Sequence, residues 1–310
     1  MSSPLVSVLM ACRNAEGWLD ETLGSALEQD YRQLEVIAID DASDDATPSL
    51  LEDAERAHPG RLKVARNVEQ RGVAMTRQGC LERAEGDFIC ILDADDTWLP
   101  GKVTRQVEVL LSRTDAAVVH TGFEAFDDVT GEVVEWGRSA PVRREGFVLR
   151  ELWLKGNFVA ASSVMIRRSA LAPGRDAFSD LGFPGYDDYF LMLALALDHP
   201  FAYIDTVLLR YRRHGGSLTS GWVAGNMHEQ DVAAMRAFAS NSPQLRRMLG
   251  RAFGKGLARH SLDAATLELA SGRRREALAH VAIAARFDPL STAAAFGSHI
   301  SRRVVPRHSE

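Results

Sequence analysis

The segment from Glu85 to Asp96 constrains the fold of this chain more than any other. An apolar run, Phe88 to Leu92, follows a Gly-Asp turn and leads directly into the acidic sequence Asp93-Ala94-Asp95-Asp96. A short, continuous apolar run indicates a strand that is buried on both faces, in the middle of a sheet. The carboxylates then stand at the carboxyl end of that strand, which is where open α/β sheets bind their ligands.

Two interpretations of this acidic sequence remain open. Closely spaced carboxylates repel one another, and a divalent cation with oxygen ligands would relieve the repulsion, so the segment predicts a metal-assisted site for an anion such as a nucleoside diphosphate. Alternatively, it is a solvated loop in which Asp96 caps a helix that begins near Leu99. Short acidic motifs occur often by chance, so this segment alone does not decide between the two interpretations.

Strands and helices alternate before this segment. The apolar runs Leu5–Met10, Leu34–Ile39 and Leu62–Ala65 are typical of strands, and helical patterns begin near Trp18, Pro48 and Gly72, with Trp18 on the apolar face of the first. This alternation predicts a mostly parallel sheet covered by helices on both faces. Asp40 and Asp41 end the second strand, so they should lie along the same sheet edge as Asp93 and Asp95.

The pattern is less regular after residue 98. Expected elements are a helix at Leu99–Leu111, strands at Ala116–His120 and Glu132–Trp136, a helix at Phe147–Lys155, a strand at Ala161–Ile166, a helix at Asp187–Leu197, strands at Phe201–Ile204 and Val207–Tyr211, and a cationic loop at Arg212–Ser217. After Gly221 only helices are expected, at Val232–Phe238, Leu245–Leu257, Leu262–Leu269 and Glu276–Phe287.

Composition limits the cellular setting. No apolar run approaches the ~18 residues of a membrane span, and the first residues lack the basic region of a signal peptide. The three cysteines, Cys12, Cys80 and Cys90, show no pairing or metal spacing and are expected to be buried thiols in a reducing compartment. These features favour a cytoplasmic protein.

Charge is divided unevenly along the 310 residues. The net charge is -6, yet residues 246–310 carry 12 Lys and Arg against 5 Asp and Glu. This basic C-terminal region could contact an anionic membrane surface at the cytoplasmic face, or it could be a solvated helical face.

Six short segments occur in a fixed order between Leu5 and Thr219. They are Val6–Asn14, Ile39–Thr47, Gln70–Gln78, Asp93–Asp95, Asp187–Tyr189 and Tyr211–His214. In this order they resemble a family 2 glycosyltransferase with the GT-A fold, an inverting enzyme that depends on a nucleotide-sugar. The resemblance implies an α/β, Rossmann-like GT-A domain over residues 1–220, with a nucleotide-sugar half at about 1–120 and an acceptor half at about 121–220, followed by an all-α region at 221–310.

The same resemblance assigns roles to residues. It implies nucleotide-sugar binding by Ala11, Arg13, Asp41, Arg71, Arg77, Asp93, Ala94 and His214, metal binding by Asp95 and His214, and a catalytic base at Asp188. The sequence departs from the family pattern after the first strand, where Ala11-Cys12-Arg13 replaces Pro-Thr-Tyr, at Asp187, which replaces Glu, and at Gln70 and Gln78, which replace Asn. None of these departures removes the metal ligand or the base.

The implied chemistry is physically consistent. Breaking a sugar–phosphate bond leaves charge on the departing diphosphate, which Mn²⁺ or Mg²⁺ would stabilise, while a carboxylate accepts the proton of the attacking hydroxyl. The expected partners are a nucleoside diphosphate sugar, with UDP favoured, and a glycan or lipid-linked acceptor of cell-surface polysaccharide, glycolipid or glycoprotein synthesis, with no nucleic acid. The alternatives are an inactive nucleotide- or glycan-binding module of the same fold and a metal-dependent nucleotidyltransferase.

Overall fold

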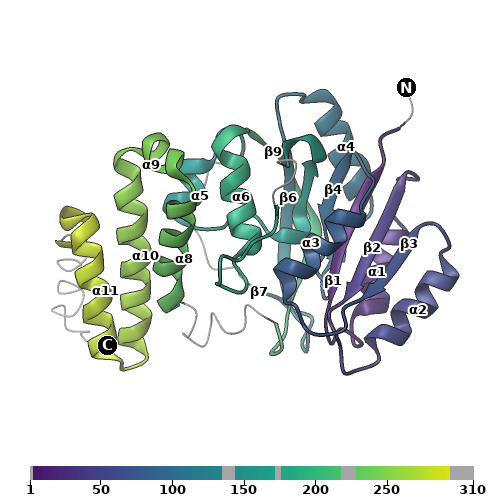
Figure 1. Ribbon diagram of the computed structural model, residues 1–310, viewed down its shortest axis with the longest axis horizontal. Coiled ribbons are helices and arrows are strands. Elements are labelled where there is room, and N and C mark those ends of the chain that lie inside the picture. Colours follow the sequence, from purple (N-terminus) through teal and green to yellow (C-terminus); the bar gives the residue numbers. More distant parts are fainter. Residues whose placement is uncertain (1–2, 135–143, 172–175, 218–227, 294–310) are drawn as a thin grey trace, which may run out of the picture. The chain divides into compact units, whose positions relative to one another are not determined.

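The computed structural model describes residues 3–134, 144–171, 176–217 and 228–293 (Figure 1). The chain forms two compact units. The first comprises Met1–Leu152 with Asn157–Ser217, and the second comprises Trp153–Gly156 with Leu218–Glu310. The domain boundary expected at residue 220, the end of the expected strand at Trp136 and the basic residues beyond 293 lie outside the described residues.

The first unit contains one mixed sheet. Its strands are β1 (Val6–Cys12), β2 (Leu34–Asp40), β3 (Leu62–Arg66), β4 (Phe88–Ile91), β5 (Thr97–Trp98), β6 (Val118–Asp127), β7 (Val133–Val134), β8 (Val164–Arg167) and β9 (Phe201–Arg213). The spatial order is β3-β2-β1-β4-β8-β6-β9-β5, and β7 pairs with β6. The strands β3, β2, β1 and β4 are parallel as the sequence predicts, whereas β8 runs antiparallel to both of its neighbours.

Helices cover both faces of the parallel half. The helices of this unit are α1 (Leu19–Leu27), α2 (Thr47–Ala57), α3 (Val73–Arg83), α4 (Lys102–Ser112), α5 (Leu149–Lys155, which extends into the second unit) and α6 (Asp187–Asp198), with short 3₁₀ turns at Ala161–Ser163 and Arg168–Ala170. Val8 and Met10 of β1 share one apolar cluster with Leu23 of α1 and Val107 of α4. Alternate strand residues point to the other face, where α3 contacts β1 and β2 and lies in front of the sheet in Figure 1. Each fully buried aliphatic side chain of this core contributes about 1.5–3 kcal/mol.

The acidic segment does not cap a helix. Thr97 and Trp98 pair with β9, and Leu99 N–H donates to Leu208 O (3.0 Å). Helix α4 begins only at Lys102, after Gly101 with φ +80°. The interpretation of Asp96 as the cap of a helix starting near Leu99 is therefore wrong. Residues 97–99 form backbone hydrogen bonds with β9, so they cannot form the first turn of a helix.

The structure also differs from the sequence prediction in the two late strands and in the strand expected at Ala161–Ile166. The segments Phe201–Ile204 and Val207–Tyr211 form the single strand β9, which continues to Arg213, with its pairing register to β6 interrupted near Gly122. Arg212 is therefore part of a strand rather than a loop. Residues Ala161–Ser163 form a 3₁₀ turn, and β8 begins at Val164.

The described residues of the second unit form helices, as the sequence predicts. Its helices are α8 (His228–Asn241), α9 (Pro243–Leu249), α10 (Arg251–Ala270) and α11 (Arg274–Phe287). The helix expected at Leu245–Leu257 is broken at Gly250 (φ +51°), and its second part is continuous with the one expected at Leu262–Leu269. Trp153 stacks on Phe253 at a centroid distance of 5.3 Å and donates to its carbonyl (2.9 Å). No helix among the described residues combines the length and hydropathy of a membrane span.

Candidate active site

The loop after β4 is fixed by hydrogen bonds from three other elements. The backbone N–H of Asp93 donates to Ser162 Oγ (3.0 Å), and Thr22 Oγ1 of α1 donates to the carbonyl of Ala94 (3.1 Å). The backbone N–H of Arg212, at the end of β9, donates to the buried Asp96 Oδ1 (3.0 Å). Burial raises the pKa of Asp96 well above its ordinary value, and the charges of Asp95 and Asp93 add to this effect. Asp96 therefore stabilises the loop from its buried side, whereas the Asp95 side chain remains partly accessible on its surface.

Asp95 and His214 face each other at the carboxyl end of the sheet. His214 Nε2 lies 3.0 Å from Asp95 Oδ2, and both side chains are partly accessible. Two ligands on adjacent corners of an octahedron with bonds of about 2.1 Å lie about 3 Å apart, so this pair fits a small divalent cation. Among the described residues no three His, Cys, Asp or Glu side chains form a complete metal site. The pair therefore fits a cation that takes its remaining ligands from phosphate and water.

Arg77 links the β4 loop to the start of α6. Its guanidinium is buried and forms ion pairs with Asp187 (Nη1 to Oδ2, 2.6 Å) and with Asp93. Burial raises the pKa of Asp93, with Asp95 and Asp187 acting in the same direction and Arg77 opposing them. A buried charge requires such pairing. Arg77 consequently fixes the first turn of α6 beside the loop that follows β4.

Asp188 is next to Asp187 on this first turn and is half-buried. Asn157 Nδ2 donates to Asp188 Oδ2 (3.0 Å), and the backbone N–H of Tyr189 lies 2.7 Å from Asp188 Oδ1. Burial raises the pKa of Asp188 to about 7, with further increases from the charges of Asp187 and Asp93 and a decrease from Arg77. A carboxylate with a pKa near neutrality can accept a proton at physiological pH, which is the property of a general base.

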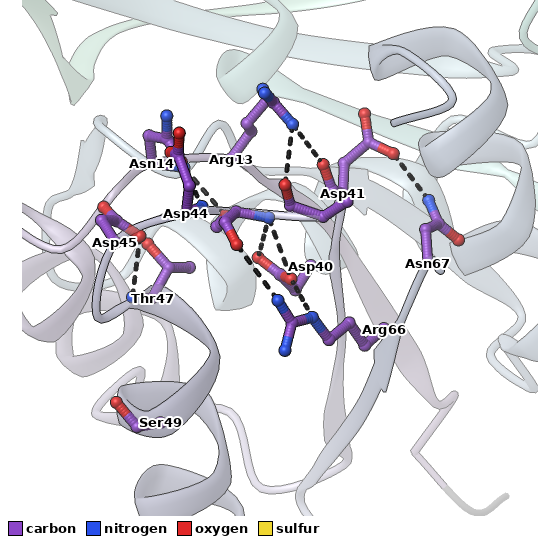
Figure 2. A network of polar contacts seen from close by, with 12 residues as sticks. Arg13, Asn14, Asp40, Asp41, Asp44, Asp45, Thr47, Ser49, Arg66 and Asn67 are labelled. Atoms are coloured by element: carbon purple, nitrogen blue, oxygen red, sulfur yellow. Dashed lines mark hydrogen bonds and ion pairs between the residues drawn. The ribbon is translucent and has the colours of Figure 1, made fainter. Parts of the chain in front are cut away.

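A second group of polar residues lies at the ends of β1 and β2 (Figure 2). Asp41 Oδ1 accepts hydrogen bonds from Asn67 Nδ2 (2.8 Å) and from the backbone N–H of Arg71 (2.8 Å), and Oδ2 accepts one from Gly72 N–H (2.9 Å). Burial raises the pKa of Asp41, but these hydrogen bonds outweigh it and hold the pKa below its ordinary value. Arg13 Nη1 donates to the carbonyl of Asp41 (2.7 Å).

The predicted site residues therefore form two groups on neighbouring strand ends. In the first group, ion pairs join Arg77 to Asp93 and His214 to Asp95, and both aspartates lie in the loop after β4. Asp188 follows Asp187, the other ion-pair partner of Arg77. The other group is Arg13, Asp41 and the backbone of Arg71, whose side chain is exposed, while Ala11 is half-buried near the end of β1 and Ala94 is buried in the β4 loop. Strand β1 lies between β2 and β4 in the sheet, so both groups stand at the edge that the parallel pattern predicts.

The sequence interpretation missed three contributors to the site. Asn157 contacts Asp188, and Ser162 fixes Asp93; both follow α5 in the irregular part of the chain and show no motif. Trp18 was expected on the apolar face of α1, which is wrong. It is the half-buried N-cap residue, and its ring lies against that of His214 at a centroid distance of 4.0 Å.

Arg212 does not form part of a free cationic loop. Its buried guanidinium is paired with Glu21 of α1 and with Asp128, to which Nη1 donates at 2.7 Å. Burial lowers the pKa of Arg212, but these two carboxylates outweigh it, so the pKa is raised. The side chain is therefore occupied by protein partners.

Comparison with known proteins identifies the family. The profile of "Glycosyl transferase family 2" matches residues 7–173, which is more than half of the chain and includes the acidic loop. The chain belongs to glycosyl transferase family 2. The family 2 assignment expected from the six ordered segments is thereby confirmed. The expected GT-A fold is confirmed by the solved structures described below.

Curated relatives match parts of the chain. The Bacillus subtilis "Putative teichuronic acid biosynthesis glycosyltransferase TuaG" is 36% identical over 39% of this chain and 47% of its own length. The Escherichia coli "UDP-Glc:alpha-D-GlcNAc-diphosphoundecaprenol beta-1,3-glucosyltransferase WfgD" is 28% identical over 71% of this chain and 81% of its own. The matched segment thus spans about half of the first relative.

Solved structures share the fold over nearly the whole chain. TarS 1-349 of S. aureus in complex with UDP-GlcNAc has a TM-score of 0.65 at 19% identity, covering 92% of this chain and 83% of its own. The mannosyltransferase PcManGT of Pyrobaculum calidifontis, in complex with GDP-Man and Mn²⁺, has a TM-score of 0.62 at 18% identity, covering 98% and 82%. At these identities the likeness establishes the fold alone.

Proposed function

We propose that this chain is an inverting glycosyltransferase that moves a sugar from a nucleoside diphosphate sugar to an acceptor hydroxyl. The observation that carries the proposal is the Arg77 bridge, because it holds the Asp188 turn beside the loop that carries Asp93 and Asp95. A proton acceptor and a binding site for the charged leaving group then lie within one network of contacts. UDP is the favoured nucleotide, since UDP-Glc appears in the name of WfgD and TarS 1-349 was solved in complex with UDP-GlcNAc.

Asp95 and His214 are the residues that would hold the metal ion. The Asp95 carboxylate suits either Mn²⁺ or Mg²⁺, the His214 imidazole favours Mn²⁺ of the two, and PcManGT is described with Mn²⁺. When bound, the cation would neutralise charge on the diphosphate as the sugar–phosphate bond breaks. The ion pair with Arg77 favours the ionised form of Asp93. In that form Asp93 would accept hydrogen bonds from hydroxyl groups of the ribose or the sugar at the same edge of the sheet.

Asp188 is the proposed catalytic base. It accepts the proton of the acceptor hydroxyl as that oxygen attacks the anomeric carbon from the side opposite the diphosphate, which inverts the configuration. The contact with Asn157 leaves lone pairs on both carboxylate oxygens for the acceptor. The residues around Asp41, with Ala11, Arg13 and Arg71, would surround the nucleotide base and ribose, at the neighbouring strand ends.

The proposed acceptor is a glycan or a lipid-linked sugar, because the name of WfgD specifies a diphosphoundecaprenol-linked sugar. Within this proposal the protein works at the cytoplasmic face of a membrane, in the synthesis of a surface polysaccharide, glycolipid or glycoprotein. Exposed arginines of the second unit, including Arg246, Arg247 and Arg251, would add electrostatic attraction to anionic lipids.

The proposal is tested first by thermal-shift screening of UDP-, GDP- and dTDP-sugars with and without Mn²⁺, followed by assays of nucleotide release with the donors that bind. We expect metal-dependent binding of one donor class, and loss of transfer in Asp95→Asn and Asp188→Asn with donor binding lost only in the former. Metal-dependent binding without transfer to any acceptor would instead favour an inactive binding module, and release of pyrophosphate would favour a nucleotidyltransferase.

A further inference from the structure

The Asp95–His214 pair belongs to a closed ring of side-chain contacts that also includes Trp18, Arg212 and Asp128. The Trp18 ring lies against the His214 ring (4.0 Å between centroids, 35° between planes), and His214 Nε2 lies 3.0 Å from Asp95 Oδ2. Arg212 Nε donates to the carbonyl of Asp95 (2.8 Å) and Arg212 Nη1 to Asp128 Oδ1 (2.7 Å). The ring of contacts closes where Trp18 Nε1 donates to Asp128 Oδ2 (3.1 Å).

Trp18 occupies a rigid position in this ring of contacts. It precedes α1, and its backbone N–H and carbonyl both form hydrogen bonds, to Ala15 O and from Thr22 N–H, each 3.0 Å. The side chain of Thr22 contacts the Ala94 carbonyl, and Glu21 is paired with Arg212. The first turn of α1 is thus bound to the β4 loop and to the end of β9 independently of the Trp18 ring.

The backbone of His214 is restrained, because its carbonyl accepts hydrogen bonds from the N–H (3.2 Å) and Oγ (3.0 Å) of Ser217, but these contacts do not fix its side chain. His214 is the first residue after β9, and a turn follows at Gly215 and Gly216. The strand and the turn hold the backbone, whereas the direction of the imidazole depends on its side-chain torsions and on the groups that the ring contacts. Its described side-chain partners are Asp95, with which it would share the cation, and the face of Trp18.

We infer that Trp18 is a positioning residue that holds the His214 imidazole toward Asp95, so that the two metal ligands are preorganised before the cation binds. The inference rests on the proposed function, because it assumes that Asp95 and His214 bind the metal. Trp18 supplies a flat apolar surface for the imidazole, and its Nε1–H also donates to Asp128. Preorganisation of this kind increases affinity by reducing the ordering that binding must impose.

The test uses the full-length chain with saturating UDP, to which Mn²⁺ is added while the free ion is measured by electron paramagnetic resonance. We expect Trp18→Ala to weaken Mn²⁺ binding about 3- to 10-fold, in line with the usual strength of an aromatic contact. Trp18→Phe, which keeps a ring over His214, should remain within about 2-fold of the native chain. Trp153→Phe in the second unit is the matched control and should not change the affinity.

A double-mutant cycle separates positioning from general damage. His214→Ala should itself weaken Mn²⁺ binding, and Trp18→Ala should then have less than about a 2-fold further effect in that background. An equal effect of Trp18→Ala in both backgrounds, an unchanged affinity in Trp18→Ala, or an equal loss in Trp18→Phe would each overturn the inference while leaving the proposed function intact. If the native chain does not bind Mn²⁺ with UDP, or if His214→Ala binds it unchanged, the metal site itself is wrong.

Discussion

Replacing Asp188 with Asn should stabilise the protein at neutral and alkaline pH while removing the proposed base. Burial and neighbouring carboxylates raise the pKa of Asp188 from its ordinary 3.8 to about 7. Between these values the unfolded chain ionises Asp188 while the folded chain keeps it protonated, so the free energy of unfolding falls as the pH rises. A shift of about three pH units corresponds to about 4 kcal/mol, and partial solvent access reduces this to about 2 kcal/mol.

The amide side chain introduced by Asp188→Asn would carry no such penalty, because it does not ionise. We therefore expect this variant to raise the free energy of unfolding by about 2 kcal/mol above pH 7, with the gain shrinking below pH 7 and vanishing near pH 4, where both states of the native protein hold the proton. The measurement is urea unfolding followed by circular dichroism at pH 4, 6 and 8, without nucleotide or metal.

The neighbouring residue provides a control of opposite sign. Asp187 is buried and forms an ion pair with Arg77 at 2.6 Å. In Asp187→Asn the buried guanidinium of Arg77 therefore loses one of its charged partners. This variant should lose about 2–3 kcal/mol at pH 8. If Asp188→Asn were also less stable than the native chain at pH 8, or if its gain were the same at pH 4 and pH 8, the assignment of Asp188 as a partly buried carboxyl group with a raised pKa would be refuted.

Further predictions concern activity and stability. Because the pKa of Asp188 is raised to about 7, kcat/KM should fall about tenfold per pH unit below that value, and a pH-independent rate down to pH 5 would contradict its role as base. Asn157→Ala removes a hydrogen bond to the ionised form, so the acidic limb of this profile should move to higher pH and kcat should fall about tenfold; Asn157→Ser, which retains a short donor, should lie in between. Asp41→Asn turns an amide toward backbone donors and should weaken UDP binding and stability by about 1–3 kcal/mol each, measured by calorimetry and unfolding. Gly86→Ala places a Cβ 2.7 Å from Ser7 N and should cost about 1–3 kcal/mol, whereas Gly17→Ala, at a position where nothing lies within 4 Å, should not lower stability by this amount.

Local patterns were sufficient to predict the parallel half of the sheet and the groups at its edge. The apolar runs before Asp41 and before Asp93 identify central strands, and parallel strands must carry their carboxyl ends to one edge. The helix that begins at Asp187 was equally visible, because its carboxylates precede a long apolar segment. What the pattern could not supply was the Arg77 bridge between Asp93 and Asp187, since Arg77 and Asp187 are 110 positions apart.

The misassigned residues share a physical cause. Arg212 has the sequence appearance of a loop residue, yet its charge is buried, because Glu21 and Asp128 reach it from elements distant in the chain. Trp18 has the appearance of a core residue, yet its indole N–H has a carboxylate partner. In each case a tertiary contact satisfies a group that local hydropathy places elsewhere.

Strand β9 restricts where related chains can change in length. From Leu209 to Arg213 the strand pairs with β6 in one continuous register, and His214 follows directly. An added or deleted residue in this interval would reverse the side of the sheet to which each later side chain projects, moving Arg212 away from Asp128 and the imidazole away from Asp95. Insertions that preserve activity should therefore fall before Phe201 or after Ser217, and sequence variants of this stretch should differ by substitution only.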